Sequence, residues 1–188
     1  MQQLSGTDKK FLLALARTVL EYIFKTGRHY RVAGSKVPAA VKEKGASFVT
    51  FTLNGELRGC IGRLEATRAL YLDVVENSYA AAFDDHRFPQ LTETELLLVK
   101  IEISVLTKPE LLPYKAAADL PELLGRDRPG VILQSGFNSA TFLPQVWEQL
   151  PDPLEFLGNL CLKAGLKGEA WRSADLQIFT YRVENFQE

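Results

Sequence analysis

The feature that most constrains this chain is a pair of strand-like runs within residues 48–62, on either side of Asn54-Gly55. An Asn-Gly dipeptide readily adopts the positive φ angles that a two-residue type I′ hairpin turn requires. The second run contains Gly59 and Gly62, although glycine inside a strand costs conformational entropy and packing. Such glycines usually mark a bulge or a place where another group approaches the backbone closely. The pattern therefore predicts an antiparallel hairpin with an unusual second strand.

The pairing register of this hairpin follows from the length of its turn. With two residues in the turn, Phe51 pairs with Arg58 and Val49 pairs with Cys60, so all four side chains share one face of the sheet. The opposite face then carries Phe48, Leu57 and Ile61. Because both faces carry apolar side chains, we expect other elements to cover the sheet on both sides.

Length and composition indicate an ordinary soluble globular protein. A chain of 188 residues is long for one domain, so we predict a single domain over residues 1–188, with a division into two subdomains as the alternative. Hydrophobic residues make up 46% and charged residues 24%. The formal net charge of −1 leaves no surplus of basic groups to neutralise phosphates. We therefore expect neither nucleic acid nor an anionic membrane as a partner.

Cysteine content and hydropathy indicate the compartment. Two cysteines are too few for a disulfide framework, which favours a reducing environment. The apolar run at residues 11–16 is interrupted by Arg17 and Glu21, and no signal-peptide cleavage pattern follows it. No segment approaches the roughly 20 apolar residues of a membrane span. We predict a cytoplasmic protein.

Hydrophobic periodicity predicts helices interspersed with pairs of strands. The predicted elements are a helix from an N-cap at Thr7 to Gly27, an irregular connector at 28–46, a helix at 68–84, a helical turn opened by a Thr92–Glu95 capping box, a strand at 99–105, a short helix at 119–125, a hairpin of 131–133 with 140–143, a helix at 153–164 and a strand at 175–184. Since the strands come in hairpins, we predict the α+β class: a largely antiparallel sheet with helices packed on it, and a smaller lobe.

The helix at 68–84 is predicted to be amphipathic. Its outer, solvent-facing stripe consists of Asp73, Glu76, Asn77 and Ala80. Leu70, Val74, Val75, Tyr79 and Phe83 form the stripe that packs on the sheet.

Cys60 is the sharpest candidate for chemistry. A reactive thiolate needs positive charge nearby and some exposure, and Arg58 projects to the same strand face two residues earlier. The flanking glycines would leave space for a substrate. The alternative is that Cys60 packs as a small hydrophobic side chain, as free cysteines often do. The second cysteine, Cys161, lies among leucines on a helix and is expected in the core.

A thiol nucleophile usually requires a base. The chain has two histidines, His29 and His86, both in segments predicted to be irregular. His86 lies beside acidic residues and Arg87, whereas its alternative is an exposed loop histidine; Glu65, just after the glycine-rich strand, is another candidate acid or base. No pair of residues has the spacing of a metal site, and no phosphate-binding glycine loop or serine-hydrolase motif occurs. The sequence thus indicates no metal and no cofactor.

Three motifs together resemble one protein family. They are Leu57-Arg58-Gly59-Cys60-Ile61-Gly62, Arg87-Phe88-Pro89 with Leu91, and Phe142-Leu143-Pro144-Gln145-Val146-Trp147, followed by a matching run from Phe156 to Leu166. In this order they are similar to the AMMECR family, whose bacterial and archaeal members are called AmmeMemoRadiSam system protein A. The resemblance covers about residues 7–183.

The resemblance implies an α+β domain with a smaller lobe, and an association with a Memo-like protein and a radical SAM enzyme. It implies no established reaction. It places the functional site at Arg58, Gly59, Cys60, Ile61 and Gly62, and we add Arg87 as a binding residue. Similar proteins tend to have proline at the position of His86, so the resemblance does not support His86 as a general base.

Two hypotheses follow. In the first, the protein is an accessory component that binds a partner, a small molecule or a peptide through the Arg-Gly-Cys-Ile-Gly strand. In the second, it is a cysteine-dependent enzyme with Cys60 as the nucleophile. A Cys60→Ser variant separates them, because only the second hypothesis requires the thiol.

Overall fold

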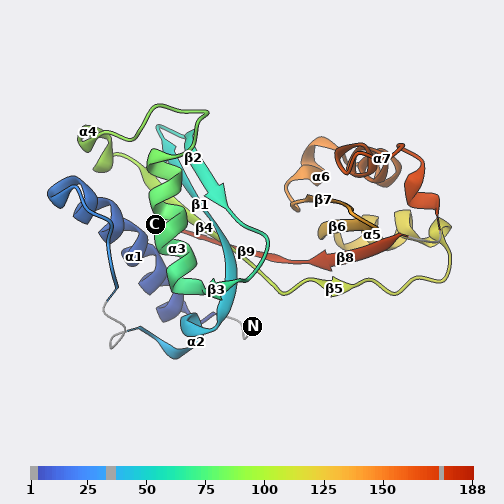
Figure 1. Cartoon of the computed structure of the whole chain (residues 1–188), viewed down its shortest axis with the longest axis horizontal. Coiled ribbons are helices and arrows are strands. Elements are labelled where there is room, and N and C mark those ends of the chain that lie inside the picture. The colour runs from blue at the N-terminus through green and yellow to red at the C-terminus, as the bar shows by residue number, and fades with distance from the viewer. Residues whose placement is uncertain (1–3, 33–36, 174–175) are drawn as a thin grey trace. The chain divides into compact units, whose positions relative to one another are not determined.

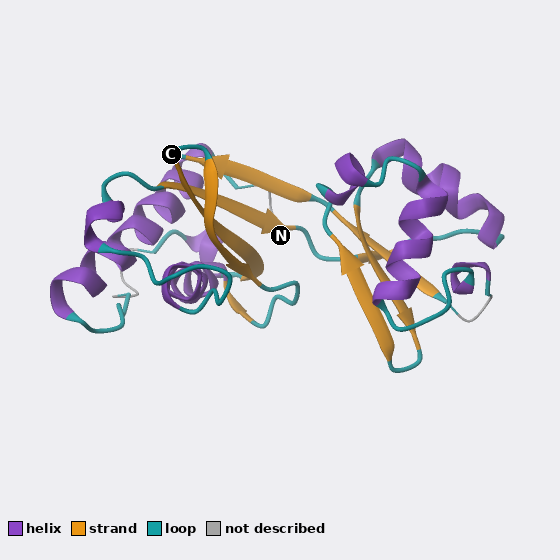
Figure 2. Cartoon of the chain, turned by 90° about the horizontal axis from the view of Figure 1, so that it is seen from above, coloured by secondary structure: helices purple, strands orange, loops and turns teal. Residues whose placement is uncertain are grey.

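The computed structural model of the chain describes residues 4–32, 37–173 and 176–188 (Figure 1). These residues form two compact units, one made of Met1–Thr107 with Glu184–Glu188 and the other of Lys108–Val183. In sequence, the second unit is therefore inserted into the first. Each unit combines helices with an antiparallel sheet (Figure 2), so the predicted α+β class is confirmed. Each unit also has its own hydrophobic core.

The first unit is built on a sheet with the strand order β2-β1-β4-β9. The strands are β1 (Lys44–Leu53), β2 (Glu56–Gly62), β4 (Lys100–Leu106) and β9 (Val183–Gln187), and the short β3 (Arg68–Ala69) pairs with the start of β1. The helices are α1 (Gly6–Thr26), α2 (Ala39–Lys42), α3 (Leu70–Phe83) and α4 (Glu93–Leu96). Because β2 pairs only with β1, it is an edge strand of this sheet.

One face of this sheet packs against α1 and α3. Val49, Phe51, Ile101 and Ile103 on this face are completely buried and join apolar side chains of both helices in one core. The apolar face predicted for residues 99–105 is thus confirmed, whereas Ser104, expected on the wet face, is also buried. The other face is different, since side chains such as Thr50 remain half-buried. Ala46, Ser104 and Leu106 on this second face are nevertheless buried, so it is covered at one end of the sheet and more open towards Thr50.

The ends of α1 follow capping chemistry, with one difference from prediction. The N-cap is Ser5 rather than Thr7, because the Ser5 hydroxyl accepts the Asp8 backbone N–H while the Asp8 carboxylate accepts the Ser5 N–H. The helix ends as predicted at Gly27, whose φ of 66° is left-handed. Neither α1 nor any other helix in the described ranges has the length and apolar character needed to cross a membrane.

The connector predicted at 28–46 contains more structure than expected. The single-turn helix α2 follows Pro38, and β1 begins as early as Lys44, where it pairs with β3. Residues 33–36 of this predicted connector lie outside the described residues. The early part of β1 was missed because Lys44, Gly45 and Ala46 carry little β propensity, so tertiary pairing rather than local preference sets the start of the strand.

The register of the hairpin differs from the predicted one. Leu53 pairs with Glu56 as expected, and Asn54 and Gly55 form the turn with positive φ, but Phe51 lies opposite Gly59 instead of Arg58. A β-bulge at Arg58 adds one residue to β2, and every later residue on β2 therefore changes face. Cys60 consequently lies opposite Thr50 and not Val49.

The C-terminal strand β9 is fixed to the first unit by Arg17. The guanidinium of Arg17 forms an ion pair with Glu188 and donates to the carbonyl oxygens of Leu96 and Val99 at 2.6 and 2.7 Å. The backbone N–H of Glu188 donates to the carbonyl of Ile101 at 3.1 Å. A single side chain on α1 thus connects α4, the residue that precedes β4, and Glu188.

The second unit has a four-stranded sheet of order β5-β8-β6-β7. Its elements are β5 (Glu110–Leu111), η2 (Ala117–Asp119), α5 (Leu120–Asp127), β6 (Gly130–Ser135), β7 (Asn138–Phe142), α6 (Val146–Gln149), α7 (Pro153–Lys163), η3 (Ala170–Arg172) and β8 (Gln177–Tyr181). The core contains the stacked rings of Trp147 and Phe156, 3.7 Å apart, and the completely buried Cys161, as predicted for that cysteine.

The strand predicted at 175–184 is in fact two strands. β8 ends at Tyr181 in the sheet of the second unit, and β9 starts at Val183 in the sheet of the first. Apolar alternation continues through this junction, which is why the sequence pattern does not reveal the change of sheet. Residues 174 and 175, at the start of the predicted strand, lie outside the described residues.

At Gly59, α3 packs directly against the backbone of β2. A Cβ atom added at Gly59 would lie 2.2 Å from the carbonyl oxygen of Ala81 on α3. That atom belongs to the backbone of a packed helix and cannot move aside by a change of rotamer. The glycine is therefore required by helix packing.

We predict that Gly59→Ala lowers the free energy of unfolding by about 2 kcal/mol or more, because the added methyl group forces α3 away from β2. Urea unfolding followed by circular dichroism measures this loss. Gly6→Ala is the matched control: nothing lies within 4 Å of a Cβ added at Gly6, in the first turn of α1, and the change should cost less than about 0.5 kcal/mol. Equal effects of the two substitutions would contradict this account of Gly59.

Candidate functional site

The thiol of Cys60 lies on the sheet face opposite to α3. Because Gly59 faces Ala81 on α3, the next residue along the strand must point to the other side. There the Thr50 hydroxyl donates a hydrogen bond to the Cys60 sulfur, with Oγ1 and Sγ 3.2 Å apart. Cys60 is half-buried and free of disulfides. The bulge has therefore moved the thiol from the predicted apolar face to one with polar neighbours.

The backbone of Cys60 is held by a carboxylate and a guanidinium. The Cys60 N–H donates to Oδ2 of Asp85 at 2.9 Å, and the Cys60 carbonyl accepts from Nη2 of Arg87 at 3.0 Å. Arg87 also donates to both oxygens of Asp85, at 2.9 and 2.7 Å. The segment after α3 is thus fastened to the middle of β2 by charged side chains.

These contacts shift the pKa values of Asp85 and Arg87. The Arg87 guanidinium, together with the N–H groups of Cys60 and Arg87, holds the pKa of Asp85 well below its usual range despite burial of the carboxyl group. The same carboxylate raises the pKa of Arg87. The side chain of Asp85 is only 5% exposed, whereas that of Arg87 is 57% exposed. The pair therefore stays charged at all physiological pH values, with its carboxylate inside and its guanidinium at the surface.

Arg58 was predicted to lie beside the thiol of Cys60, but its guanidinium binds other groups of the fold. Its Nε and Nη2 atoms donate to Oε1 and Oε2 of Glu95 at 2.8 and 3.0 Å. Its remaining donors reach the carbonyl oxygens of Pro89 and Gln90 at 2.8 and 3.2 Å. As the extra residue of the bulge, Arg58 is directed to the segment that leads into α4, and it fixes that segment to β2.

Glu95 takes part in two sets of contacts. It belongs to the predicted capping box, accepting the Thr92 N–H at 2.8 Å, and it also accepts from Arg58. Chiefly through the hydrogen bonds from Arg58, the pKa of Glu95 falls from its ordinary 4.5 to about 2. The capping box was predicted correctly, but nothing in the sequence pattern linked Glu95 to Arg58.

The other residues of the motif also serve packing. A Cβ added at Gly62 would lie 2.2 Å from the ring of Phe48, so this glycine admits an aromatic ring and does not leave space for a substrate. Ile61 packs against the core of the first unit, opposite Val49. The expectation that the two glycines would open room beside the thiol is therefore wrong.

The predicted acid–base candidates are at the surface. His86 and Glu65 are both exposed, and no contact among the described residues joins either of them to the Cys60 sulfur. The other histidine, His29, packs against Tyr79 with the two rings tilted by 36° and their centroids 4.1 Å apart. In the described ranges, no group of three or more histidine, cysteine or acidic side chains could hold a metal ion.

A buried polar cluster next to β2 was missed by the sequence prediction. Asp73 on α3 accepts hydrogen bonds from the backbone and hydroxyl of Ser47 and from the amide of Asn77, at 2.8 to 2.9 Å. Burial raises the pKa of Asp73, although Arg63 lies 2.9 Å away as an ion-pair partner. Asp73 and Asn77 were predicted to face solvent, yet both are at most 1% exposed. Their polarity misled the assignment of helix faces, since Ser47 on the adjacent strand compensates for it.

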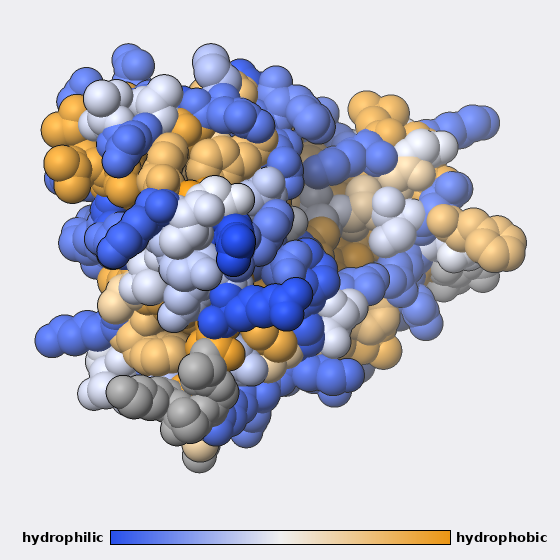
Figure 3. All heavy atoms as spheres, turned by 60° about the vertical axis from the view of Figure 1, so that its left-hand side comes forward, coloured by the Kyte–Doolittle hydropathy of each residue, from blue (hydrophilic) through white to orange (hydrophobic). Residues whose placement is uncertain are grey.

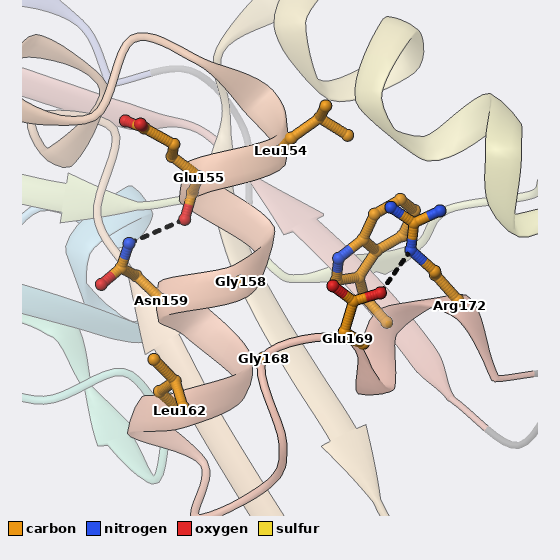
Figure 4. A pocket seen from close by; sticks show the side chains of 9 residues that line it. Leu154, Glu155, Gly158, Asn159, Leu162, Gly168, Glu169 and Arg172 are labelled. Atoms are coloured by element: carbon orange, nitrogen blue, oxygen red, sulfur yellow. Dashed lines mark hydrogen bonds and ion pairs between the residues drawn. The ribbon is translucent and has the colours of Figure 1, made fainter.

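A shallow hollow of about 290 Å³ lies in the second unit, between α7 and η3 (Figure 4). Its wall includes Trp171 with the guanidinium of Arg172 above the indole ring, 4.4 Å from its centroid, and Glu169 forms an ion pair with Arg172 at 3.2 Å. In the close-up, Gly158 and Gly168 lie between this group and the side chains of Glu155, Asn159 and Leu162. The motif strand does not contribute to this hollow.

Comparison with known proteins decides the family. The family model of AMMECR1 matches residues 13–186, nearly the whole chain. This chain belongs to the AMMECR1 family.

Relatives of similar length support the assignment. A protein from Thermofilum pendens is 36% identical over 199 residues, covering 100% of this chain and 93% of that protein. Protein MK0488 from Methanopyrus kandleri is 35% identical, covering 100% and 91%. The crystal structure of the uncharacterized protein PH0010 from Pyrococcus horikoshii superposes with a TM-score of 0.83 at 32% identity, covering 98% of this chain and 93% of that one.

The Arg58–Glu95 pair predicts a particular dependence of stability on pH. Because the pKa of Glu95 in the folded protein lies below 4.5, the pair contributes fully to the free energy of unfolding above that pH and loses its contribution as the pH falls towards 2. Glu95→Gln should therefore cost about 1–2 kcal/mol at neutral pH and progressively less in acid. Urea unfolding at several pH values measures the difference between the two proteins.

Glu93→Gln is the matched control, since Glu93 lies in the same helical turn but has no ion-pair partner among the described residues. This substitution should change the free energy of unfolding by less than about 0.5 kcal/mol. A cost of Glu95→Gln that does not change between neutral and acid pH would contradict the assignment.

Proposed function

We propose that this AMMECR1-family protein is an accessory component of the cytoplasm that docks a protein partner beside the Arg-Gly-Cys-Ile-Gly strand. By family resemblance, its partners are a Memo-like protein and a radical SAM protein. The observation that carries the proposal is that the groups of the motif are used inside the fold, while apolar side chains at the same end of the sheet are left exposed.

The first part of this support concerns the motif. The Arg58 guanidinium is bonded to Glu95 and to two backbone carbonyls, and Gly59 and Gly62 admit Ala81 and Phe48. Groups that are fully engaged in this way shape a surface, but they are not free to bind and transform a substrate. The motif therefore supports a role in holding β2 and the segment that leads into α4 in one arrangement.

The second part concerns the apolar side chains near this strand. Leu57 on β2 is 45% exposed, and Leu97 and Leu98, just after α4, are 89% and 64% exposed. They lie at one end of the sheet, because Leu57 pairs with Thr52, and Thr52 pairs in turn with Lys100, two residues after Leu98. Figure 3 shows that on the face it presents, apolar groups form patches between hydrophilic ones. Clustered exposed leucines are typical of a site where another protein binds.

A second candidate function rests on the thiol itself. Cys60 is half-buried rather than sealed in the core, and the Thr50 hydroxyl lies 3.2 Å from its sulfur. This arrangement favours the alternative of a cysteine-dependent enzyme, in which Cys60 is the nucleophile and the motif positions it. The two functions make opposite predictions for the loss of the thiol.

We predict that Leu97→Lys/Leu98→Lys abolishes co-purification with the Memo-like and radical SAM proteins of the same organism, because it places two charges where an apolar partner surface would pack. Cys60→Ser should leave both complex formation and the activity of the reconstituted system unchanged. Co-expression followed by affinity purification measures complex formation. Turnover by the reconstituted mixture of the proteins measures activity.

Leu154→Lys/Leu162→Lys is the matched control, since these leucines of α7 are 49% and 60% exposed and belong to the second unit. This control should bind the partners like the native protein. An intact complex with both double variants would refute docking at Leu97 and Leu98. Loss of turnover in Cys60→Ser with the complex intact would establish the enzyme instead.

A further inference from the structure

The free edge of β2 has an alternating pattern of backbone groups. In an antiparallel pair, residues alternate between those bonded to the neighbouring strand and those whose N–H and C=O point away from it. The Arg63 N–H donates to the Ser47 carbonyl, so Arg63 and Ile61 face β1, while Cys60 and Gly62 face outward. Two residues of the motif therefore present backbone donors and acceptors at the edge of the sheet.

The outward backbone groups of Cys60 have hydrogen-bond partners, whereas those of Gly62 have none among the described residues. For Cys60, the Asp85 carboxylate supplies an acceptor and the Arg87 guanidinium supplies a donor, in the places where a neighbouring strand would supply a carbonyl and an N–H. For Gly62, no hydrogen bond of the described residues engages the outward N–H or C=O. The Asp85–Arg87 pair thus stands in for one residue of a missing strand, and the pairing stops there.

An exposed strand edge is a template for pairing with another chain, and charged side chains at the edge are one way in which proteins prevent it. The Asp85–Arg87 pair protects the edge in this way. It forms hydrogen bonds with the backbone N–H and C=O of Cys60, and it places the guanidinium of Arg87, which is 57% exposed, beside the strand. A second β2 strand cannot approach without displacing Arg87 and separating it from a carboxylate that is only 5% exposed.

We infer that the Cys60–Gly62 edge of β2 is a self-association surface that Asp85 and Arg87 keep closed. Its occupant, once the pair is removed, is β2 of a second copy of this chain. The geometry fixes the register: an antiparallel pair centred on Ile61 brings Cys60 of each copy opposite Gly62 of the other. This satisfies the outward groups of both residues. The inference goes beyond the proposed function, since it concerns the backbone edge of β2 and does not use Leu97 and Leu98, and each is tested by its own variants.

The test is the oligomeric state of Asp85→Ala/Arg87→Ala in the full chain, measured by light scattering after size exclusion over a range of concentrations. The native protein should not associate through this edge. The molecular mass of the double variant should rise with protein concentration from the monomer value of 21.0 kDa towards twice that value. Glu122→Ala/Arg126→Ala, which removes an exposed ion pair from α5 without changing the net charge, should behave like the native protein.

Hydrogen exchange locates the association. In the native protein, the Cys60 amide should be protected by Asp85 and the Gly62 amide should exchange rapidly. In the associated double variant, both amides should become protected, and dilution should release them. Ile61, whose amide faces β1, reports that the strand itself remains folded.

Arg87→Ala is the second variant, because it opens the Cys60 carbonyl while leaving the Asp85 contact to the Cys60 N–H in place. It should associate more weakly than the double variant, and it keeps the test valid if the double variant does not fold. The inference is overturned if the folded variants remain monomeric, or if they associate while the Gly62 amide continues to exchange rapidly.

Discussion

The approach of α3 to Gly59 is the constraint on which the motif strand depends. With the Ala81 carbonyl oxygen where a Cβ would lie, only glycine fits this position of β2. The bulge at Arg58 brings Gly59, instead of its larger neighbour, to the helix-facing side. Cys60 must then face the other way, towards Thr50. One close contact between a helix backbone and a strand therefore determines the position of a glycine, an arginine and a cysteine that are consecutive in the sequence.

Contacts from one loop segment complete this arrangement. Asp85 and Arg87 hold the backbone of Cys60, and Glu95 holds the side chain of Arg58. Both carboxylates have a pKa far below the ordinary value because each accepts hydrogen bonds from an arginine. The stretch between α3 and β4 is thus attached to the edge strand at two separate points, with charged hydrogen bonds taking the place of a further strand.

Predictions from the sequence were correct for features that depend only on residues close together in the chain. The Asn54-Gly55 turn, the capping box at Thr92 and the alternation around Ile101 depend on neighbours a few residues away, and each was predictable. The glycines of β2 indicated a bulge or a close approach to the backbone, but the position of the bulge and the resulting register were not predictable, because only packing on α3 selects the register. For the same reason, the partners of Arg58 and Cys60 could not be predicted: they lie 25 to 37 residues further along the chain. Asp73 on α3 was wrongly predicted to face solvent, because the Ser47 hydroxyl that donates a hydrogen bond to it belongs to β1, far away in the sequence.

The path of the chain between β8 and β9 affects the order in which the protein can fold during synthesis. β9 belongs to the sheet of the first unit, yet it follows the entire second unit in sequence, and its end is held by Arg17 near the start of the chain. As the polypeptide leaves the ribosome, the first unit therefore lacks an edge strand until β9 emerges. During this interval β4 has an unpaired edge, and the inserted unit has time to fold by itself. The sheet of the first unit is therefore completed only after the whole second unit has been synthesised, so nascent chains that stop short of β9 carry an open sheet.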